Sequence, residues 1–310
     1  MRVFGSTVAT VLYLIFAGLA VAAVGATQGD KSGEKPANFN DDEAVRKLFA
    51  SWNIPFKPFR IIGNIHYVGV SGISSFLITT PEGHILIDSG FESTVPLIRD
   101  SVEKLGFRFA DIKILLSSHA HVDHVGGHAL MKQLTGAEIV MSETDADLLA
   151  SGGSKDFLFK SEMMRFKPAK ADRIVRDGDA VNLGGTKLIC HLTPGHTKGC
   201  TTWTMKMSTD GKIHDVMFFG STSINPGTKL VNNENYPGIA SDLAATYKKL
   251  KAMPCNIFLA PHGSFFQLTE KARRLECGEE PNPFLDSRIF PAFLEQAERT
   301  FQAQLAVEKK

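Results

Sequence analysis

The segment from Ser117 to Gly127 carries three histidines and one aspartate within six residues. Imidazole and carboxylate groups are ligands that Zn²⁺ accepts in proteins. His119 and His121 are two residues apart, so both can face one ion from an extended or looped chain. The adjacent Asp123 and His124 can face a second ion. The alternative is a solvated polar loop, but four ligand-type residues at this spacing argue against it. The segment therefore predicts a metal site.

The residues on either side place this segment at the end of a strand. Residues 112–116 form a short apolar run, which is typical of a buried strand that ends at the edge of a sheet. Gly126 and Gly127 fit a tight turn into the next helix. We therefore expect the metal site to lie at a sheet edge.

The remaining pattern predicts a mixed α/β chain. Residues 61–87 contain four strand-like runs separated by turn residues, which is typical of an antiparallel meander. Residues 95–105 have apolar side chains at helical spacing. Further strands are expected at 138–141, 173–175, 186–192, 200–205, 216–219 and 257–260, and further helices at 41–52, 129–134, 143–150, 241–250 and 290–307. Residues 151–170 lack periodicity and are interpreted as a loop.

The His-x-His-x-Asp-His motif followed by Gly-Gly resembles the signature of the metallo-β-lactamase superfamily. Residues 193–197 and 259–263 resemble the two later ligand-bearing turns of that superfamily, and residues 85–90 resemble its Asp-bearing early strand. The resemblance extends over residues 52–266. It implies an α/β fold, the αββα sandwich of two mixed β-sheets flanked by helices, and a hydrolytic activity.

The resemblance also implies two zinc ions per chain. The implied ligands are His119, His121 and His196 for one ion, and Asp123, His124 and His262 for the other. Asp123 thereby counts as a catalytic residue as well as a ligand. Bound zinc lowers the pKa of water to about 7, so a metal-bound hydroxide would attack the scissile carbonyl. No covalent enzyme intermediate is needed in this hypothesis.

Ser221 indicates the branch of the superfamily. The glyoxalase II enzymes and most lactonases carry a metal-bridging Asp at this position, and the first β-lactamase subclass carries a Cys ligand. A neutral Ser cannot supply an anionic bridge. The resemblance is therefore to class B metallo-β-lactamases of the third subclass, and it implies hydrolysis of the amide bond of β-lactam antibiotics, which are small-molecule substrates. Two alternatives stay open: a di-metal hydrolase acting on a lactone or thioester, and a non-catalytic zinc-binding protein.

Other residues are candidates for supporting roles. The candidates for binding the carboxylate of the substrate are Ser221, Ser223, Asn225 and Asn233. Ordinary turn formation is an equally good interpretation of the serines. Asp88 would orient a metal-bound histidine by accepting its second ring N–H, and His191 is a further candidate for a supporting role. Residues 160–170 are more basic and Met-rich than the subclass pattern, which leaves substrate preference open.

The chain has four cysteines: Cys190, Cys200, Cys255 and Cys277. An even number in an exported protein allows disulfides, for which four cysteines give three pairings, and four free thiols are the alternative. The resemblance implies one disulfide, between Cys255 and Cys277. It leaves Cys190 and Cys200 unassigned.

The N-terminal residues resemble an export signal. A basic start, an apolar run at 8–24 and small residues at 24–26 predict a signal peptide over residues 1–26. The alternative is a permanent membrane anchor. Residues 27–45 are expected to be a flexible leader and residues 46–310 the metallo-β-lactamase domain. We therefore expect a periplasmic or secreted protein with no stable membrane anchor after cleavage.

The charge balance narrows the class of partner. The formal net charge is +1 in 310 residues, so nothing indicates binding to nucleic acid or to an anionic membrane surface. The composition does not indicate an oligomeric state.

Overall fold

A computed structural model describes residues 41–209 and 211–310. The predicted signal peptide, the alternative membrane anchor and residues 27–40 of the predicted leader lie outside the described residues. Helix α1 (Asp42–Trp52) has Asp41 as its N-cap, whose carboxylate accepts the backbone N–H groups of Glu43 and Ala44. The helix therefore begins ahead of the domain boundary expected at residue 46.

The first sheet contains seven strands that neighbour one another in chain order. These are β1 (Phe59–Ile62), β2 (Ile65–Tyr67), β3 (Phe76–Thr80), β4 (Gly83–Ile87), β5 (Ile112–Leu116), β6 (Glu138–Ser142) and β7 (Arg173–Val175). Strands β1 to β4 pair antiparallel, as the meander predicts, whereas β4 to β7 pair parallel. Parallel neighbours need crossover connections. Those connections hold α2 (Val95–Lys104), α3 (Val122–Val125), α4 (His128–Thr135) and α5 (Glu143–Ala150).

The second sheet contains five strands in the order β12-β11-β10-β9-β8. Their bounds are β8 (Ala180–Leu183), β9 (Thr186–Leu192), β10 (Thr201–Thr209), β11 (Lys212–Phe218) and β12 (Ile257–Leu259). Strands β8 to β11 pair antiparallel, and β12 pairs parallel to β11 after the crossover helix α6 (Ile239–Lys251). Both sheets are therefore mixed.

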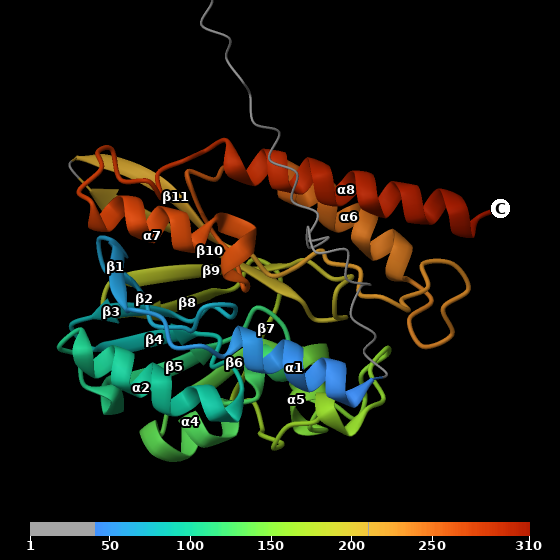
Figure 1. The fold of residues 1–310 in the computed structure, drawn as a ribbon, viewed down its shortest axis with the longest axis horizontal. Helices are drawn as coiled ribbons and strands as arrows, with labels where there is room; N and C mark the ends of the chain where they lie inside the picture. The colour runs from blue at the N-terminus through green and yellow to red at the C-terminus, as the bar shows by residue number, and fades with distance from the viewer. Residues whose placement is uncertain (1–40, 210) are drawn as a thin grey trace, which may run out of the picture.

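The helices cover the outer faces of the two sheets. Figure 1 shows α1, α2, α4 and α5 on the side of the first sheet, and α6, α7 (Leu268–Glu276) and α8 (Ile289–Glu308) on the side of the second. The short 3₁₀ helices are η1 (Glu92–Thr94), η2 (Phe109–Asp111), η3 (Glu162–Met164) and η4 (Gly263–Phe266). The predicted αββα sandwich is confirmed.

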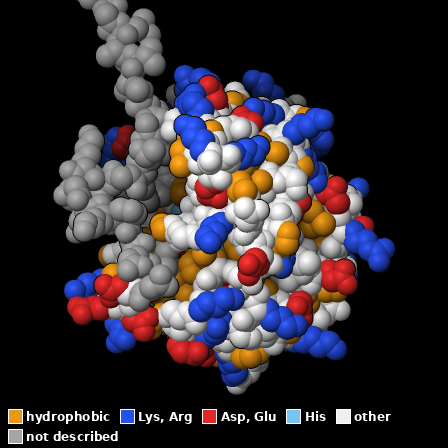
Figure 2. Space-filling model, turned by 90° about the vertical axis from the view of Figure 1, so that its right-hand side faces the viewer, with side chains coloured by type: hydrophobic (Ala, Val, Ile, Leu, Met, Phe, Trp, Pro, Cys, Tyr) orange, Lys and Arg blue, Asp and Glu red, His pale blue; other side chains and the backbone are white. Residues whose placement is uncertain are grey.

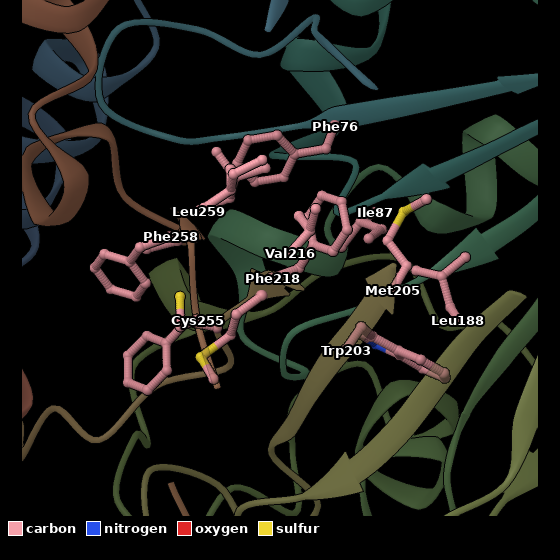
Figure 3. Close-up of a cluster of buried hydrophobic side chains, with 14 of the residues drawn as sticks. Phe76, Ile87, Leu188, Trp203, Met205, Val216, Phe218, Cys255, Phe258 and Leu259 are labelled. Atoms are coloured by element: carbon pink, nitrogen blue, oxygen red, sulfur yellow. The ribbon is translucent and has the colours of Figure 1, made fainter. Parts of the chain in front are cut away.

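The core lies in layers because strand side chains alternate between the two faces of a sheet. In β5, Ile114 and Leu116 join the cluster between the sheets, whereas Leu115 joins the cluster under α2 and α4. Figure 3 shows part of the inter-sheet cluster, where Trp203 and Phe218 of the second sheet lie near Ile87 of the first. Burial on both faces explains why β5 is apolar at every position except the exposed Lys113.

Strand β8, helix α7 and the single-turn helix α3 were not predicted. Strand β8 is a short edge strand in which only Val181 is fully buried, so it has little apolar pattern. Helix α7 fully buries only Leu268 and Lys271, and five of its nine residues are charged. Both are too weakly apolar for periodicity to reveal. The loop predicted at 151–170 is present and contains the single turn η3.

The predicted disulfide is wrong. In the structure all four cysteines are free thiols. Cys255 is buried in the inter-sheet cluster beside Phe258 (Figure 3). Cys277, in contrast, lies exposed just after the last turn of α7. A disulfide needs both sulfur atoms to point at each other, and one thiol that faces the core and one that faces solvent do not meet that condition. Cys190 and Cys200 are buried and unpaired as well.

The surface carries charges of both signs. Figure 2 shows Lys and Arg side chains interspersed with Asp and Glu over one face, with scattered apolar atoms between them. This distribution agrees with the formal net charge of +1. Among residues 41–209 and 211–310, no helix combines the length and apolarity that crossing a membrane requires.

Candidate metal centre

Six candidate ligands lie on segments that follow the carboxyl ends of strands. Strand β5 precedes the segment that contains His119, β9 precedes the turn with His196, and β12 precedes His262. Strands β9 and β12 run in the same direction. Strand β9 and strand β11 both pair antiparallel with β10, and β12 pairs parallel with β11. The backbone N–H of Thr201 donates to Ser118 O at 2.8 Å and joins the two sheets at this edge. The fold thus brings residues up to 143 positions apart in the sequence to one edge.

A short helix and a close backbone approach position the central pair of ligands. Asp123 and His124 lie on α3, which is a single turn. Gly126 and Gly127 have ordinary φ values of −55° and −83°, so they are not required for an unusual turn. A Cβ on Gly127 would instead lie 2.7 Å from the carbonyl oxygen of Ser89. Glycine is needed there because two backbones touch.

The first group of candidate ligands is His119, His121 and His196. All three are buried, and their candidate ligand atoms lie within 4.8 Å of one another. The Nε2 atoms of His119 and His196 are 3.1 Å apart. The structure therefore brings together the three residues that the sequence assigns to one ion.

Hydrogen bonds on the outer side of two rings fix which nitrogen faces the centre. Nδ1 of His196 donates to the carbonyl of Ser223 at 2.7 Å. Nδ1 of His119 lies 3.1 Å from Oγ of Ser118, whose hydroxyl donates to Asp88 and therefore accepts from the ring. Both Nε2 atoms thus carry lone pairs, and these face each other at 3.1 Å. A cation between them satisfies both lone pairs, so this donor set fits a divalent metal ion.

The second group is Asp123, His124 and His262, whose ligand atoms also lie within 4.8 Å of one another. Oδ2 of Asp123 is 3.1 Å from Nε2 of His124 and 3.6 Å from Nε2 of His262. Nδ1 of His262 donates to the carbonyl of Gly72 at 3.1 Å, and Nδ1 of His124 lies 3.2 Å from Oδ2 of Asp88. Asp88 therefore lies where the sequence prediction needs it, behind a candidate ligand.

Without a metal ion, three of the candidate ligand rings are neutral and a fourth is protonated beside a carboxylate. Burial lowers the pKa of His119 well below its ordinary value, that of His196 to about 3 and that of His262 to about 4, so these rings are neutral at pH 7. Burial opposes charge on His124 too, but the carboxylate of Asp123 outweighs it and raises the pKa of His124 to about 10. The same attraction holds the pKa of Asp123 well below its ordinary value.

Asp145 was not identified from the sequence, yet it joins both ligand-bearing turns. Its Oδ2 accepts the backbone N–H of Ala120 and the hydroxyl of Thr197, and its Oδ1 accepts the backbone N–H of Gly199, each at 2.9 Å. Burial raises the pKa of this carboxyl to about 6, although the three hydrogen bonds oppose the rise. In the sequence it is only one more acidic residue in the first turn of a helix, so no signal marks it.

Asp156 was also missed, and it lies in the predicted loop. Its Oδ1 accepts the backbone N–H groups of Leu158 and Phe159, both at 2.7 Å, and its Oδ2 lies 3.2 Å from Nε2 of His121. Burial raises the pKa of this carboxyl, but the contacts with His121 and the backbone outweigh that effect and lower it to about 2. The carboxylate is therefore ionised beside the ring.

The supporting role expected of His191 is not visible in the structure, which places His128 behind the site instead. His191 is on β9, where its Nε2 lies 2.8 Å from the hydroxyl of Thr204. Nδ1 of His128 lies 2.7 Å from Oγ of Ser89, and the backbone N–H of Ser89 donates to the carbonyl of His124. The sequence gives no sign of this contact, since it depends on the first residue of α4 lying beside the segment that follows β4.

A cavity of about 1570 Å³ opens over the two groups. Ser221, Ser223 and Asn225 line it, as the sequence predicts for substrate-binding residues. Its apolar walls are formed by Trp52, Phe159, Met164, Phe166 and Phe265. Asn233 does not belong to this lining. Its half-buried side chain closes a local turn by accepting the backbone N–H groups of residues 235 and 236.

The family model for the metallo-beta-lactamase superfamily matches residues 68–262 of this chain, a span that holds all six candidate ligands. The chain belongs to the metallo-beta-lactamase superfamily. Solved structures from this superfamily agree. Native FEZ-1 metallo-beta-lactamase from Legionella gormanii is 45% identical, with a TM-score of 0.82 over 83% of this chain and 98% of its own. LRA-12, a class B3 di-zinc metallo-beta-lactamase from an Alaskan soil metagenome, is 34% identical, with a TM-score of 0.78 over 83% and 97%.

The curated relatives of this superfamily member are more distant. Hydroxyacylglutathione hydrolase GloC of Haemophilus influenzae is 28% identical over 216 residues, which make up 66% of this chain and 87% of that protein. Human mitochondrial persulfide dioxygenase ETHE1 is 25% identical over 197 residues, and the chain spans only 64% of its length. The predicted superfamily and the likeness to the third β-lactamase subclass are thus confirmed, and the protein is a metal-binding hydrolase of this superfamily.

Proposed function

We propose that this protein hydrolyses the amide bond of β-lactam antibiotics with two zinc ions. The observation that carries the proposal is the cavity wall formed by Ser221, Ser223 and Asn225. Residues 219–228 contain no carboxylate, so this wall is electrostatically compatible with the carboxylate that β-lactams carry. Similarity to FEZ-1 and to LRA-12, which is a di-zinc enzyme, supports the same conclusion.

The six candidate ligands would hold the two ions. His119, His121 and His196 would bind one, and Asp123, His124 and His262 the other. Bound zinc lowers the pKa of water to about 7 and polarises carbonyl groups. The ligands themselves are held from behind by hydrogen bonds, of which the bond from His196 to Ser223 O is one. A rigid donor set of this kind binds metal without first being ordered.

The cavity residues would bind and orient the substrate. Ser221 is buried, and its Oγ accepts the backbone N–H of Ser223 at 3.1 Å, which leaves its hydroxyl proton available to the carboxylate of the substrate. Asn225 can donate from its amide. In the same cavity, the rings of Trp52 and Phe265 offer an apolar surface to the side chain of the antibiotic.

The location of the protein is a related proposal. We propose that residues 1–26 direct export to the periplasm or the medium and are then removed, on the pattern of the basic start and the apolar run at 8–24. N-terminal sequencing of the exported protein tests this. A mature chain that still begins at Met1 would contradict it.

The main experiment compares three substrates on one preparation. The purified exported protein is assayed with a chromogenic cephalosporin, a hydroxyacyl thioester of glutathione and a lactone, each before and after chelation, and zinc is counted on the same samples. We expect two zinc ions per chain and cephalosporin turnover that chelator abolishes and zinc restores. Thioester turnover without cephalosporin turnover would instead favour the activity for which GloC is named. A single tightly held ion with no gain on adding zinc would exclude the two-metal mechanism.

A further inference from the structure

Within residues 41–209 and 211–310, the loop at 151–170 supplies the one carboxylate that lies within 4.0 Å of a ring nitrogen in the first group of candidate ligands. Asp156 is 4% exposed and lies opposite the ring of His121. The two oxygens of its carboxylate make different contacts. Oδ1 accepts two backbone N–H groups of the loop, and Oδ2 lies 3.2 Å from Nε2 of His121. The loop therefore fixes the carboxylate, and the carboxylate faces the ring.

This contact determines which nitrogen of His121 can bind a metal. The two atoms face each other at 3.2 Å, and neither has another hydrogen-bond partner among the described residues. Because a carboxylate can only accept, a single ring proton is more stable on Nε2, which leaves the lone pair on Nδ1. His119 and His196 have the opposite arrangement, because their Nδ1 atoms are used by the protein and their Nε2 atoms face the centre. His121 thus offers a different atom from its two neighbours, and Asp156 is the group that selects it.

We propose that Asp156 is a positioning residue that presents Nδ1 of His121 to the first metal ion. The inference rests on the proposed function, because it assumes that this group of histidines binds zinc. It also assigns a role to the loop at 151–170, in which residues 160–170 differ from the subclass pattern. Under this proposal, zinc binding and the loop conformation stabilise each other, because the same carboxylate contacts both the ring of His121 and the loop backbone.

Other contacts hold the loop in the conformation that this role needs. The ring of Phe159 packs edge-on against His121, with centroids 5.1 Å apart. The ammonium of Lys160 donates to the carbonyl of Asp156 at 2.6 Å. The hydroxyl of Ser161 donates to Asp42 of α1 at 2.6 Å, which joins the loop to the first helix. Asp156 is therefore held by neighbours on both sides.

The substitution Asp156→Asn separates positioning from a merely structural role. In the variant the side-chain amide oxygen can keep the two hydrogen bonds from the backbone N–H groups of Leu158 and Phe159. The side-chain NH₂ group then takes the place of Oδ2. That group donates to Nε2 of His121 and forces the ring proton onto Nδ1, which blocks the atom that should bind metal. The loop is retained and only the tautomer changes. Asp147→Asn is the matched control, because Asp147 is exposed and paired only with Lys155.

Two measurements test the proposal. Competition with a chromophoric chelator should show that Asp156→Asn weakens one of two zinc sites by about 10- to 100-fold, whereas Asp147→Asn leaves both unchanged. Nitrogen NMR of the metal-free protein should show His121 protonated on Nε2 in the wild type and on Nδ1 in the Asn variant. Asp156→Glu, which keeps the charge, should recover part of the lost affinity.

The possible failures are distinguishable. Wild-type zinc affinity in a folded Asp156→Asn variant would overturn the proposal, and so would a wild-type His121 protonated on Nδ1. The second result needs no variant, so it decides the matter even if Asp156→Asn does not fold. A wild-type protein that takes up no zinc would refute the proposed function instead, and the NMR measurement would still report on the contact between Asp156 and His121.

Discussion

Replacing Gly72 by alanine should destabilise both the end of α1 and the second group of candidate ligands. The backbone N–H of Gly72 donates to the carbonyl of Trp52 at 3.0 Å, and its own carbonyl accepts from Nδ1 of His262 at 3.1 Å. The indole of Trp52 in turn packs on the His262 ring, with centroids 5.0 Å apart. A shift at Gly72 therefore affects the helix and the candidate ligand together.

The magnitude follows from the space available. A Cβ at Gly72 would lie 2.7 Å from Cα of Trp52 and 2.8 Å from its Cβ, closer than real Cβ atoms come to a neighbour. Backbone atoms cannot rotate away, so the helix end must move. Overpacking of this kind costs about 1–3 kcal/mol, and the lost hydrogen bond to Trp52 adds about 1 kcal/mol. We expect the free energy of unfolding to fall by about 2–4 kcal/mol in total.

Urea unfolding of the metal-free protein measures this loss, and zinc titration measures the effect on His262, for which we expect about 10-fold weaker binding at one site. Gly238→Ala is the control, because Gly238 has an ordinary φ of −86° and a Cβ there would meet its nearest neighbour at 3.6 Å. Gly238 is the N-cap of α6, so alanine there should cost no more than about 1 kcal/mol. A Gly72→Ala variant with wild-type stability and zinc affinity would refute the packing argument.

Two further substitutions test the charge balance of the site and of the core. In Ser221→Asp, a carboxylate on the cavity wall should repel the carboxylate of the antibiotic, so β-lactam hydrolysis should fall by about 10-fold or more, equivalent to at least about 1.4 kcal/mol, while zinc content stays at two and an uncharged lactone loses less. Steady-state kinetics on both substrates check this, and unchanged β-lactam turnover would remove the main support for the role of Ser221. Burial lowers the pKa of Lys271 from 10.5 to about 8. At pH 7 the buried ammonium should therefore lower the free energy of unfolding by about 3 kcal/mol. Because the unfolded chain binds more protons than the folded one between pH 8 and 10.5, wild-type stability should rise over that range. Lys271→Met should therefore stabilise the protein at pH 7 by up to about 3 kcal/mol, and this gain should disappear near pH 10.5. Urea unfolding of the variant and the wild type at both pH values measures the gain. A gain that does not depend on pH would show that the buried charge is not its cause.

The candidate ligands of the central segment were predicted from the local sequence pattern. His119, His121, Asp123 and His124 lie within six residues, so their chemistry is visible in the sequence before any folding is considered. His196 and His262 were identified through the resemblance to a known family, because each occurs in a recognisable turn after a strand. The sandwich was identified in the same way, since periodicity alone predicts only a mixed α/β chain.

Contacts between distant segments could not be predicted from those patterns. Asp145 bonds to a backbone N–H 25 residues away, and the carbonyl of Gly72 pairs with a side chain 190 residues away. An Asp in a helix or loop has the same local pattern whether it faces solvent or a buried ring. The wrong disulfide has the same origin, because its formation depends on where Cys255 and Cys277 point.

The sequence by itself thus determined which residues can bind metal, because ligand chemistry belongs to the residue type and to short spacing. The tertiary structure decided how each ring is held. The carboxylate beside His121, the carbonyl behind His262 and the free state of the thiols depend on which segments the packed sheets bring within a few ångströms. The physical reason is that hydrogen bonds act over about 3 Å, whereas the chain brings together partners from segments that are far apart in the sequence.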